Sequence, residues 1–241
     1  MGVLEALIRL GRPSSLSEIA KASGLSASQA HRYLASFVNT GFLRQDSVSL
    51  EYDLHTAALR LGLAAMARMD VFEAAGRVAQ SLVAETGRTI LLAIWAEQGP
   101  TVVRWYPGDP PIYTTLAIGS RLPLSGSATG HVFLTFQPAS FTAAMRQAEA
   151  QSDRGAKDLD HEVITAQVRR DLCAEVDSTL IPGLRACAAP VFNMQGELSL
   201  VMSVIASSGF DASGDAGSRH ALLRAAKDLT LSLGGRWPDG R

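Results

Sequence analysis

The sequence contains few cysteines, and this scarcity excludes several classes of protein. Only Cys173 and Cys187 occur among the 241 residues, and neither belongs to a CxxC pair or stands in a histidine cluster. A secreted disulfide framework needs more cysteines, and a structural zinc site needs four ligands at closer spacing. We therefore expect two buried thiols, no disulfide framework and no metal site.

Long hydrophobic runs and an excess of either charge are also missing. No apolar stretch approaches the roughly 18 residues of a membrane-spanning helix, and the first residues do not form a basic, apolar leader. The 22 basic and 23 acidic residues leave a net charge of −1. We accordingly expect a cytoplasmic protein that has no membrane partner. Its content of 47% hydrophobic and 19% charged residues excludes a disordered or fibrous chain.

Motifs for catalysis and cofactor binding are absent as well. The sequence has no GxSxG, no GxxxxGK[ST] and no GxGxxG, and its five histidines stand apart. Ser127 and His131 are one helical turn apart, but no acidic residue is identified that would orient the histidine. We expect no catalytic residue and no cofactor. The alternative is a small-molecule hydrolase that uses Ser127 and His131.

The segment over residues 15–41 holds the strongest positive signal, two helix starts separated by a glycine. SLSE begins at Ser15 and SASQ begins at Ser26, and both are capping boxes with a hydroxyl at the cap and a Glu or Gln three residues later. Gly24 lies between them and permits the left-handed conformation that a sharp turn needs. The segment therefore predicts a helix-turn-helix.

The second of these helices has a polar outward face. Ala30 and Leu34 belong to its apolar stripe, which leaves short polar residues and one arginine on the opposite side. A major groove about 12 Å wide admits one helix, whose first turns then reach base edges and phosphates. A solvated face on a small helical bundle is the alternative interpretation. The residues that we predict to contact DNA from this helix and its cap are Ser26, Ser28, Gln29, His31, Arg32 and Ser36.

A hairpin is expected directly after this helix. Residues 42–45 and 48–54 alternate weakly between apolar and polar positions, which is sufficient for two short strands around a turn. Such a hairpin is a wing, and Arg44 at its base would contact a phosphate without reading sequence. Together with an apolar first helix, residues 1–54 therefore predict a winged helix-turn-helix.

The charge of this region predicts that DNA binding requires more than one copy. Residues 1–69 carry seven basic and five acidic side chains, and a net charge of +2 gives little phosphate neutralisation. We expect a homodimer or a dimer of dimers. Residues 55–69 predict a linker helix whose apolar side cannot be covered by the helix alone. The apolar positions of this linker are Ala58, Leu61, Leu63, Ala65 and Met66, and its solvated positions are Arg60 and Arg68.

From residue 70 onward the pattern becomes mixed α and β. A hairpin of two apolar strands and a later pair of strands alternate with helices, which predicts an α+β, GAF-like domain with an antiparallel sheet over residues 70–241. The expected strands are 89–96, 101–107, 113–118, 184–192 and 198–206. The expected helices are 71–86, 125–135, 139–150, 160–175 and 218–233.

Small residues from Ser125 to Gly130 open one of these helices and suggest an anion site. Backbone amides at such a helix start are exposed and aligned with the positive end of the helix dipole, which favours a carboxylate. The alternative is that Ser127 is only a helix cap. An arginine would pair with the acid, and aromatic rings would suit an aromatic or longer acyl acid, although buried rings are also ordinary core and an arginine also lies in solvent. The candidates beside Ser127 are Trp95, Arg104, Tyr106, Tyr113 and His131.

Several short motifs follow one another along nearly the whole chain. They are VLEAL at Val3, LSEIA at Leu16, HRYL at His31, GFL at Gly41, YDL at Tyr52, LG at Leu61, GSRLPL at Gly119, SATG at Ser127 and AAPVF at Ala188. In order and spacing they resemble the IclR-type bacterial transcriptional regulators. The resemblance implies a winged helix-turn-helix, a linker helix that takes part in pairing two modules, and a GAF-like effector domain.

The resemblance also implies positions for an effector pocket. By position these are the amides of Ala128 and Thr129 and the strand residues Leu184, Ala186 and Ser203. Val176 stands where relatives often carry an acidic residue, which argues against a glyoxylate-sized polar effector. We therefore expect a DNA-binding transcriptional regulator whose binding to a double-stranded DNA operator is modulated by a small organic acid. The alternative from another class is a sensor-type interaction protein whose winged helix mediates protein contacts.

Overall fold

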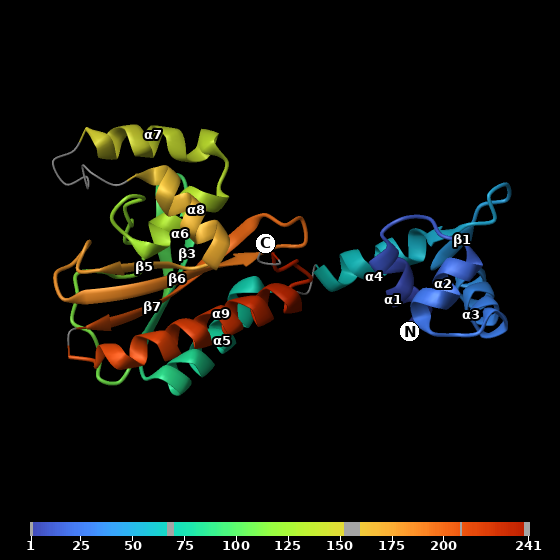
Figure 1. Ribbon diagram of the computed structural model, residues 1–241, viewed down its shortest axis with the longest axis horizontal. Coiled ribbons are helices and arrows are strands. Elements are labelled where there is room, and N and C mark those ends of the chain that lie inside the picture. Colours follow the sequence, from blue (N-terminus) through green and yellow to red (C-terminus); the bar gives the residue numbers. More distant parts are fainter. Residues whose placement is uncertain (1, 67–69, 152–159, 208, 239–241) are drawn as a thin grey trace. The chain divides into compact units, whose positions relative to one another are not determined.

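The computed structural model describes residues 2–66, 70–151, 160–207 and 209–238 (Figure 1). The chain divides into two compact units, residues 1–69 and 70–241, and each is described by itself. None of the described helices combines the length and the hydropathy of a membrane-spanning segment.

The first unit is a winged helix-turn-helix followed by one further helix. Both predicted capping boxes form, and Gly24 ends the first helix of the motif with φ of 68°. The apolar sides of the first three helices and of the hairpin share one core around Ile19, Leu34 and Leu43. The elements are α1 (Gly2–Leu10), α2 (Leu16–Ser23), α3 (Ala27–Asn39), β1 (Leu43–Gln45), β2 (Tyr52–Leu54) and α4 (Thr56–Met66).

Helix α4 presents apolar side chains that its own unit does not bury. Its start is tied to the end of the α3–β1 turn, since the Ala57 amide donates to the Gly41 carbonyl at 3.1 Å. Leu59 and Leu61 are 63% and 61% exposed, as expected for a helix that cannot cover its apolar side. Of the linker residues named from the sequence, Arg68 and the side chains of Leu63, Ala65 and Met66 lie outside the described part.

The second unit is a five-stranded antiparallel sheet with helices on both faces (Figure 1). The strand order is β4-β3-β7-β6-β5, so the two strands at the edges come from the middle of the chain. Helices α5 and α9 lie side by side on one face, and α6 and α8 cover the other. The strands are β3 (Thr89–Ala96), β4 (Gly99–Tyr106), β5 (Ala174–Asp177), β6 (Leu184–Phe192) and β7 (Leu198–Ser207). The helices are α5 (Val71–Thr86), α6 (Ala128–Phe136), α7 (Ala139–Ala150), α8 (His161–Asp171) and α9 (Asp215–Ser232), with a short 3-10 turn at Ala212–Gly214.

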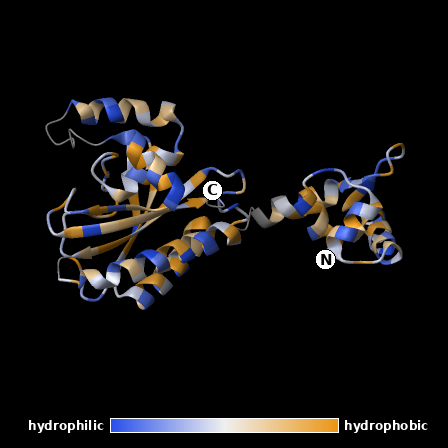
Figure 2. Cartoon of the chain, viewed as in Figure 1, coloured by the Kyte–Doolittle hydropathy of each residue, from blue (hydrophilic) through white to orange (hydrophobic). Residues whose placement is uncertain are grey.

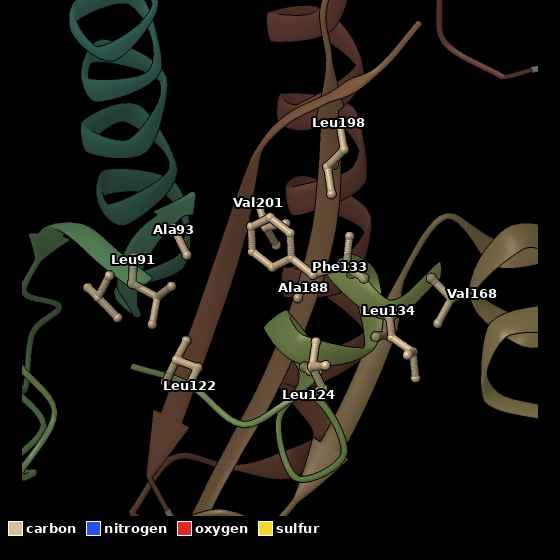
Figure 3. Close-up of a cluster of buried hydrophobic side chains, with 14 of the residues drawn as sticks. Leu91, Ala93, Leu122, Leu124, Phe133, Leu134, Val168, Ala188, Leu198 and Val201 are labelled. Atoms are coloured by element: carbon tan, nitrogen blue, oxygen red, sulfur yellow. The ribbon is translucent and has the colours of Figure 1, made fainter. Parts of the chain in front are cut away.

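The sheet is apolar on both faces, and the period of two along each strand divides its residues between two cores. Ile90 and Leu92 face α5 and α9, whereas Leu91 and Ala93 face α6. Figure 3 shows Leu91, Ala93 and Phe133 within the core on the α6 side of the sheet. In Figure 2 the strands are mainly hydrophobic in colour while α5 and α9 carry both colours, as expected for helices with one buried side.

One predicted element is wrong and another is too long. Residues 113–118 form no strand, because the outer side of β4 is already bonded to residues 119–122 through pairs such as the Val102 amide and the Ser120 carbonyl. The predicted helix over 160–175 ends at Asp171, where Leu172 adopts φ of 51°. The chain then forms the edge strand β5, whose alternation is too short to recognise without its partner β6.

A partly buried ion network ties the start of α9 to the sheet. The Asp215 carboxylate accepts a hydrogen bond from Arg88 and another from Arg185 Nε at 2.6 Å. The Arg88 side chain is only 6% exposed. Although partial burial opposes the charge of Asp215, the two guanidinium groups lower its pKa below the usual range.

We expect Asp215→Asn to lower the free energy of unfolding by about 2–3 kcal/mol at pH 7, because it leaves the buried Arg88 charge without its counterion. The pKa of Asp215 is lower in the folded protein than in the unfolded chain. Its stabilising contribution is therefore complete above the unfolded pKa of about 4 and is lost as the pH falls through the folded pKa. Urea unfolding at pH 7 and at lower pH measures this difference.

The control for this prediction is Glu73→Gln, which removes the exposed partner of Arg77 on α5. Exposed pairs contribute little, so the control should leave the unfolding midpoint nearly unchanged. Equal midpoints for both variants at pH 7 would contradict a stabilising role for the partly buried network.

Candidate functional site

The predicted DNA-contact residues of α3 lie together on its exposed side. Ser26, Ser28, His31 and Arg32 are all exposed, and so are Gln29 and Ser36, while Ala30 and Leu34 are buried beneath them. The side-chain oxygen Oε1 of Gln29 accepts hydrogen bonds from the Ser26 amide and hydroxyl at 3.2 and 3.1 Å. Gln29 therefore fixes the start of the helix, and its Nε2 is the part suited to a donor contact.

Tyr33 is a candidate DNA contact that the sequence analysis missed. It is 46% exposed and stands four residues after Gln29, on the same side of α3. The guanidinium carbon of Arg32 lies 5.7 Å from the centre of its ring. The signal in the sequence was its spacing from Gln29, because residues four apart share one face of a helix.

Arg44 is exposed at the base of the wing, as predicted, but it has a partner. Its guanidinium donates to the Asp53 carboxylate at 3.1 Å, across the pairing of β1 with β2. The side chain remains 62% exposed. A phosphate contact at this position would therefore compete with an ion pair within the wing.

A second candidate site is a pocket between the sheet and the start of α6. Strand register explains its wall, because Leu91, Ser203 and Ala188 are neighbours across the sheet, as are Val176, Ala186 and Ile205 in the next row. The accessible space of this partly open pocket is about 40 Å³, which is enough for a few water molecules. The lining residues are Leu91, Leu116, Leu122, Ser127, Ala128, Thr129, Val176, Leu180, Ile181, Leu184, Ala186, Ser203 and Ile205.

The polar groups of this pocket are hydroxyls and the first amides of α6. Ser127 is the N-cap, since its hydroxyl accepts from the Gly130 amide at 2.9 Å and donates to the Pro123 carbonyl at 2.7 Å. Thr129 and Ser203 exchange a hydrogen bond of 2.9 Å between their hydroxyls. The amides of Ala128 and Thr129 lie in the first turn, where no carbonyl of the helix precedes them. These amides give the pocket a positive end.

The segment before α6 is held rigidly against the helix. The Glu149 carboxylate of α7 accepts hydrogen bonds from the Leu124 and Ser125 amides at 2.7 and 2.9 Å. A Cβ atom on Gly130 would lie 2.0 Å from the Pro123 carbonyl oxygen, so only glycine permits this close approach. The start of α6 is thereby fixed in position.

His131 supports this segment and does not line the pocket. Its ring is 7% exposed, and Nε2 lies 2.9 Å from the Ser125 carbonyl oxygen, so this nitrogen is the donor. Burial lowers the pKa of His131 below its usual range, although the Ser125 carbonyl acts in the opposite direction. The neutral imidazole therefore serves as a structural donor beneath the helix start.

The structure brings together some of the predicted ligand residues and separates others. Ser127, Ala128, Thr129, Leu184, Ala186 and Ser203 all line the pocket. Trp95 faces the same side of the sheet and packs edge-on against Phe133, but it lines a separate, larger hollow. Leu180 lines both spaces.

The other three predicted ligand residues do not reach the pocket. Arg104 and Tyr106 pair with Leu92 and Ile90, so they lie on the face of the sheet that carries α5 and α9. Arg104 there stacks over Phe72 of α5, with 5.5 Å between its guanidinium carbon and the ring centre. Tyr113 is 93% exposed. The sequence did not reveal which set of alternate residues along β4 faces α6.

The residues that the sequence analysis missed belong mainly to loops. Leu116 and Leu122 come from the irregular segment after β4, and Leu180 and Ile181 come from the turn between β5 and β6. Loop residues carry no period that would indicate their direction. Leu91 and Ile205 were within predicted strands. Ile205 lies two residues after Ser203 and therefore points to the same face of the sheet, which is how the sequence could have indicated it.

Family models match both units of the chain. The IclR helix-turn-helix domain matches residues 1–47, and the model described as "Bacterial transcriptional regulator IclR C-terminal" matches residues 63–231. The glycerol operon regulatory protein of Streptomyces coelicolor is 29% identical over 186 residues, which cover 75% of this chain and 72% of the relative. The regulator KipR of Bacillus subtilis is 26% identical over 93% of this chain and 90% of its own length.

Solved structures give the same result at the level of the whole chain. Pseudomonas aeruginosa HmgR superposes with a TM-score of 0.87 at 33% identity, over 98% of this chain and 97% of the other. An IclR homologue from Microbacterium hydrocarbonoxydans, solved as a complex with 4-hydroxybenzoate, has the same fold, with a TM-score of 0.57 at 16% identity over 96% of both chains. The motifs, the exposed recognition helix and the two matching models lead to one conclusion: this chain belongs to the IclR family of DNA-binding transcriptional regulators.

Proposed function

We propose that the pocket at the start of α6 binds a small organic carboxylate and that this ligand modulates operator binding. The observation that carries the proposal is that the residues with the first amides of α6 and the hydrogen-bonded hydroxyls of Thr129 and Ser203 line the same pocket, whose other walls are apolar. A carboxylate would accept from the Ala128 and Thr129 amides, and the helix dipole favours its charge. The apolar walls would take the hydrocarbon part of the same molecule.

A monocyclic aromatic acid is the class of ligand that we propose. The complex of an IclR homologue with 4-hydroxybenzoate provides the precedent. The accessible space of about 40 Å³ is small beside the roughly 150 Å³ of a cavity that holds benzene. The ligand therefore needs more space, and we propose that it gains this space by displacing Leu180, which lines both the pocket and the larger hollow beside Trp95. Such a displacement links ligand binding to a change of conformation.

The DNA partner is a double-stranded operator, and we propose that two or more copies of the chain bind it together. The exposed leucines of α4 and the small positive charge of one module support a homodimer or a dimer of dimers. As a DNA-binding protein it would act in the cytoplasm. The ligand would leave chemically unchanged, because its role is to favour one arrangement of the paired modules by binding it more tightly.

The operator contact of α3 provides the test of DNA binding. We expect Arg32→Ala to weaken operator binding by roughly 5- to 150-fold, the range of about 1–3 kcal/mol for one lost contact. Fluorescence anisotropy with labelled DNA from the upstream region of the gene, at fixed salt, measures the affinity. The matched control is Arg77→Ala, an equal change of charge on the exposed surface of α5. Unchanged affinity in Arg32→Ala, with both proteins folded, would contradict the assignment of this face.

A further inference from the structure

The two cysteines lie side by side at one edge of the sheet of the second unit. Their sulfur atoms are 2.7 Å apart, and neither belongs to a disulfide bond. Cys187 is directly opposite Glu175 in the pairing of β6 with β5, and Cys173 is two residues before Glu175. Residues two apart on a strand share one face, so this pair is a diagonal neighbour pair across two strands.

One member of the pair is accessible. Cys187 lines an open hollow of about 360 Å³, together with Glu175, Arg185 and Ser218. Cys173 is buried, with 3% of its surface exposed. A small oxidant that enters the hollow therefore meets Cys187, the less buried of the two cysteines, and the sulfur of Cys173 is the group next to it.

A cationic side chain completes the surroundings of the pair. The Nε atom of Arg219 on α9 lies 3.5 Å from the Glu175 carboxylate. Burial disfavours the charge of Arg219, but Cys173 and Glu175 beside it raise its pKa above the usual value. The guanidinium therefore pairs with the Glu175 carboxylate beside the two thiols.

We propose that Cys173 and Cys187 form a reversible disulfide within one chain when the protein meets a hydroperoxide. The sulfur of Cys187 attacks one peroxide oxygen, the O–O bond breaks, and the other oxygen leaves as an alcohol or as water with the thiol proton. The product is a sulfenic acid on Cys187. Cys173 then attacks that sulfur, the S–S bond forms, the S–O bond breaks, and the hydroxyl leaves as water with the proton of Cys173. The two thiols lose two electrons in total, and the peroxide gains them.

The hydrogen bond that Cys187 shares with Cys173 favours the protonated form of Cys187, and together with burial it raises the pKa of Cys187 above the usual thiol value. Because the thiolate is the more reactive form, the first step is slow. Formation of the disulfide therefore needs sustained exposure to the oxidant.

A shared metal ion fits this geometry less well than a disulfide. Cys173, Glu175 and Cys187 offer ligand atoms within 4.8 Å of one another. Two thiolates at about 2.3 Å from a tetrahedral zinc ion, however, stand roughly 3.7 Å apart, and these sulfurs are separated by only 2.7 Å. The Glu175 carboxylate is also already directed to Arg219.

The bond would join the edge strand that carries Val176 to the strand that carries Ala186, two residues that line the candidate ligand pocket. Fixing this edge restrains one wall of the pocket. We therefore expect the oxidised protein to bind 4-hydroxybenzoate at least threefold more weakly or more tightly than the reduced protein. This expectation rests on the proposed function, whereas the disulfide itself rests on the sulfur geometry alone.

The test treats the reduced full chain with hydrogen peroxide, and separately with diamide, before alkylation and intact-mass measurement. Because the chain has only two cysteines, a loss of two hydrogen atoms from a monomeric species identifies the bond without mapping. We expect this species to be the main product, to revert with dithiothreitol, and to unfold at a temperature about 5 °C higher. Cys173→Ser and Cys187→Ser should instead give oxygen adducts or cross-linked dimers.

Three outcomes would overturn the inference. One is that the wild-type chain gives the same oxygen adducts and cross-linked dimers as the single variants. Another is that both thiols stay reduced under excess oxidant. The third is that one zinc ion per chain binds and protects both thiols from peroxide, which would make the cluster a metal site. Calorimetry with 4-hydroxybenzoate separates the two parts: equal affinity in both redox forms overturns the effect on the pocket and leaves the disulfide standing.

Discussion

Filling the pocket at Ser203 should abolish ligand binding and leave operator binding intact. Ser203 lies on β7 between Leu91 and Ala188, and its hydroxyl bonds to Thr129 of α6. Ser203→Leu places a branched side chain in an accessible space of only about 40 Å³. We expect the affinity for 4-hydroxybenzoate to fall at least 100-fold, measured by isothermal titration calorimetry.

Two further variants keep this prediction testable if Ser203→Leu fails to fold. Ser203→Val adds less volume and should give an intermediate loss, because overpacking strains a dense core in proportion to the added groups. Ser203→Ala removes the hydroxyl but keeps the space, so it should retain most of the affinity. If Ser203→Leu and Ser203→Val both fold and both bind the ligand as tightly as wild type does, the ligand site lies elsewhere.

The chemical part of the proposal is tested with the ligand. A site built on the amides of Ala128 and Thr129 should prefer 4-hydroxybenzoate over the neutral 4-hydroxybenzamide by at least tenfold, because the helix dipole and the aligned amides favour the anion. Equal affinity for the acid and the amide would show that the amides do not hold the charge, even if the pocket is correct.

Local rules predicted the helices of the first unit well and the lining of the candidate pocket only in part. The capping boxes and Gly24 act within a few residues, so the sequence alone contained the information for α2 and α3. The side of the sheet that Arg104 and Tyr106 face depends on which helices cover each face and on the register shift between Leu92 and Ala93. These are long-range properties that no local pattern records. The resemblance to a family supplied the strand positions that alternation left ambiguous.

The errors in the second unit have the same origin. Tyr113 and Ile118 looked like strand residues, yet both are exposed, since the edge of β4 was occupied by the segment around Ser120. β5 has only four residues, and its stability depends on pairing with β6. Edge strands of this length gain their structure from the neighbouring strand, so a sequence pattern predicts them poorly.

If two copies of the chain pair through α4, as we propose, charge on its exposed leucines should separate the copies and remove most of the operator affinity. Leu59 and Leu61 are each more than 60% exposed, although the leucine side chain is ordinarily buried. Ile8 of α1, at 60% exposed, adds a third large apolar side chain to the surface of the same unit. The unit does not bury these side chains itself, which supports the proposal that α4 takes part in pairing two copies.

The expected result for the double variant Leu59→Asp, Leu61→Asp is a loss of dimer and a fall in operator affinity of at least 100-fold. Linking two weak DNA-binding modules raises affinity by about 10²- to 10⁴-fold, and one module of net charge +2 gains little from the phosphates alone. Sedimentation velocity reports the oligomeric state, and anisotropy at fixed salt reports the affinity. The matched control is Leu231→Asp on α9, a leucine that is 51% exposed in the other unit. A double variant that stays dimeric and binds the operator as wild type does would show that the modules are paired through another surface; a monomer with undiminished affinity would show that pairing is not needed for binding.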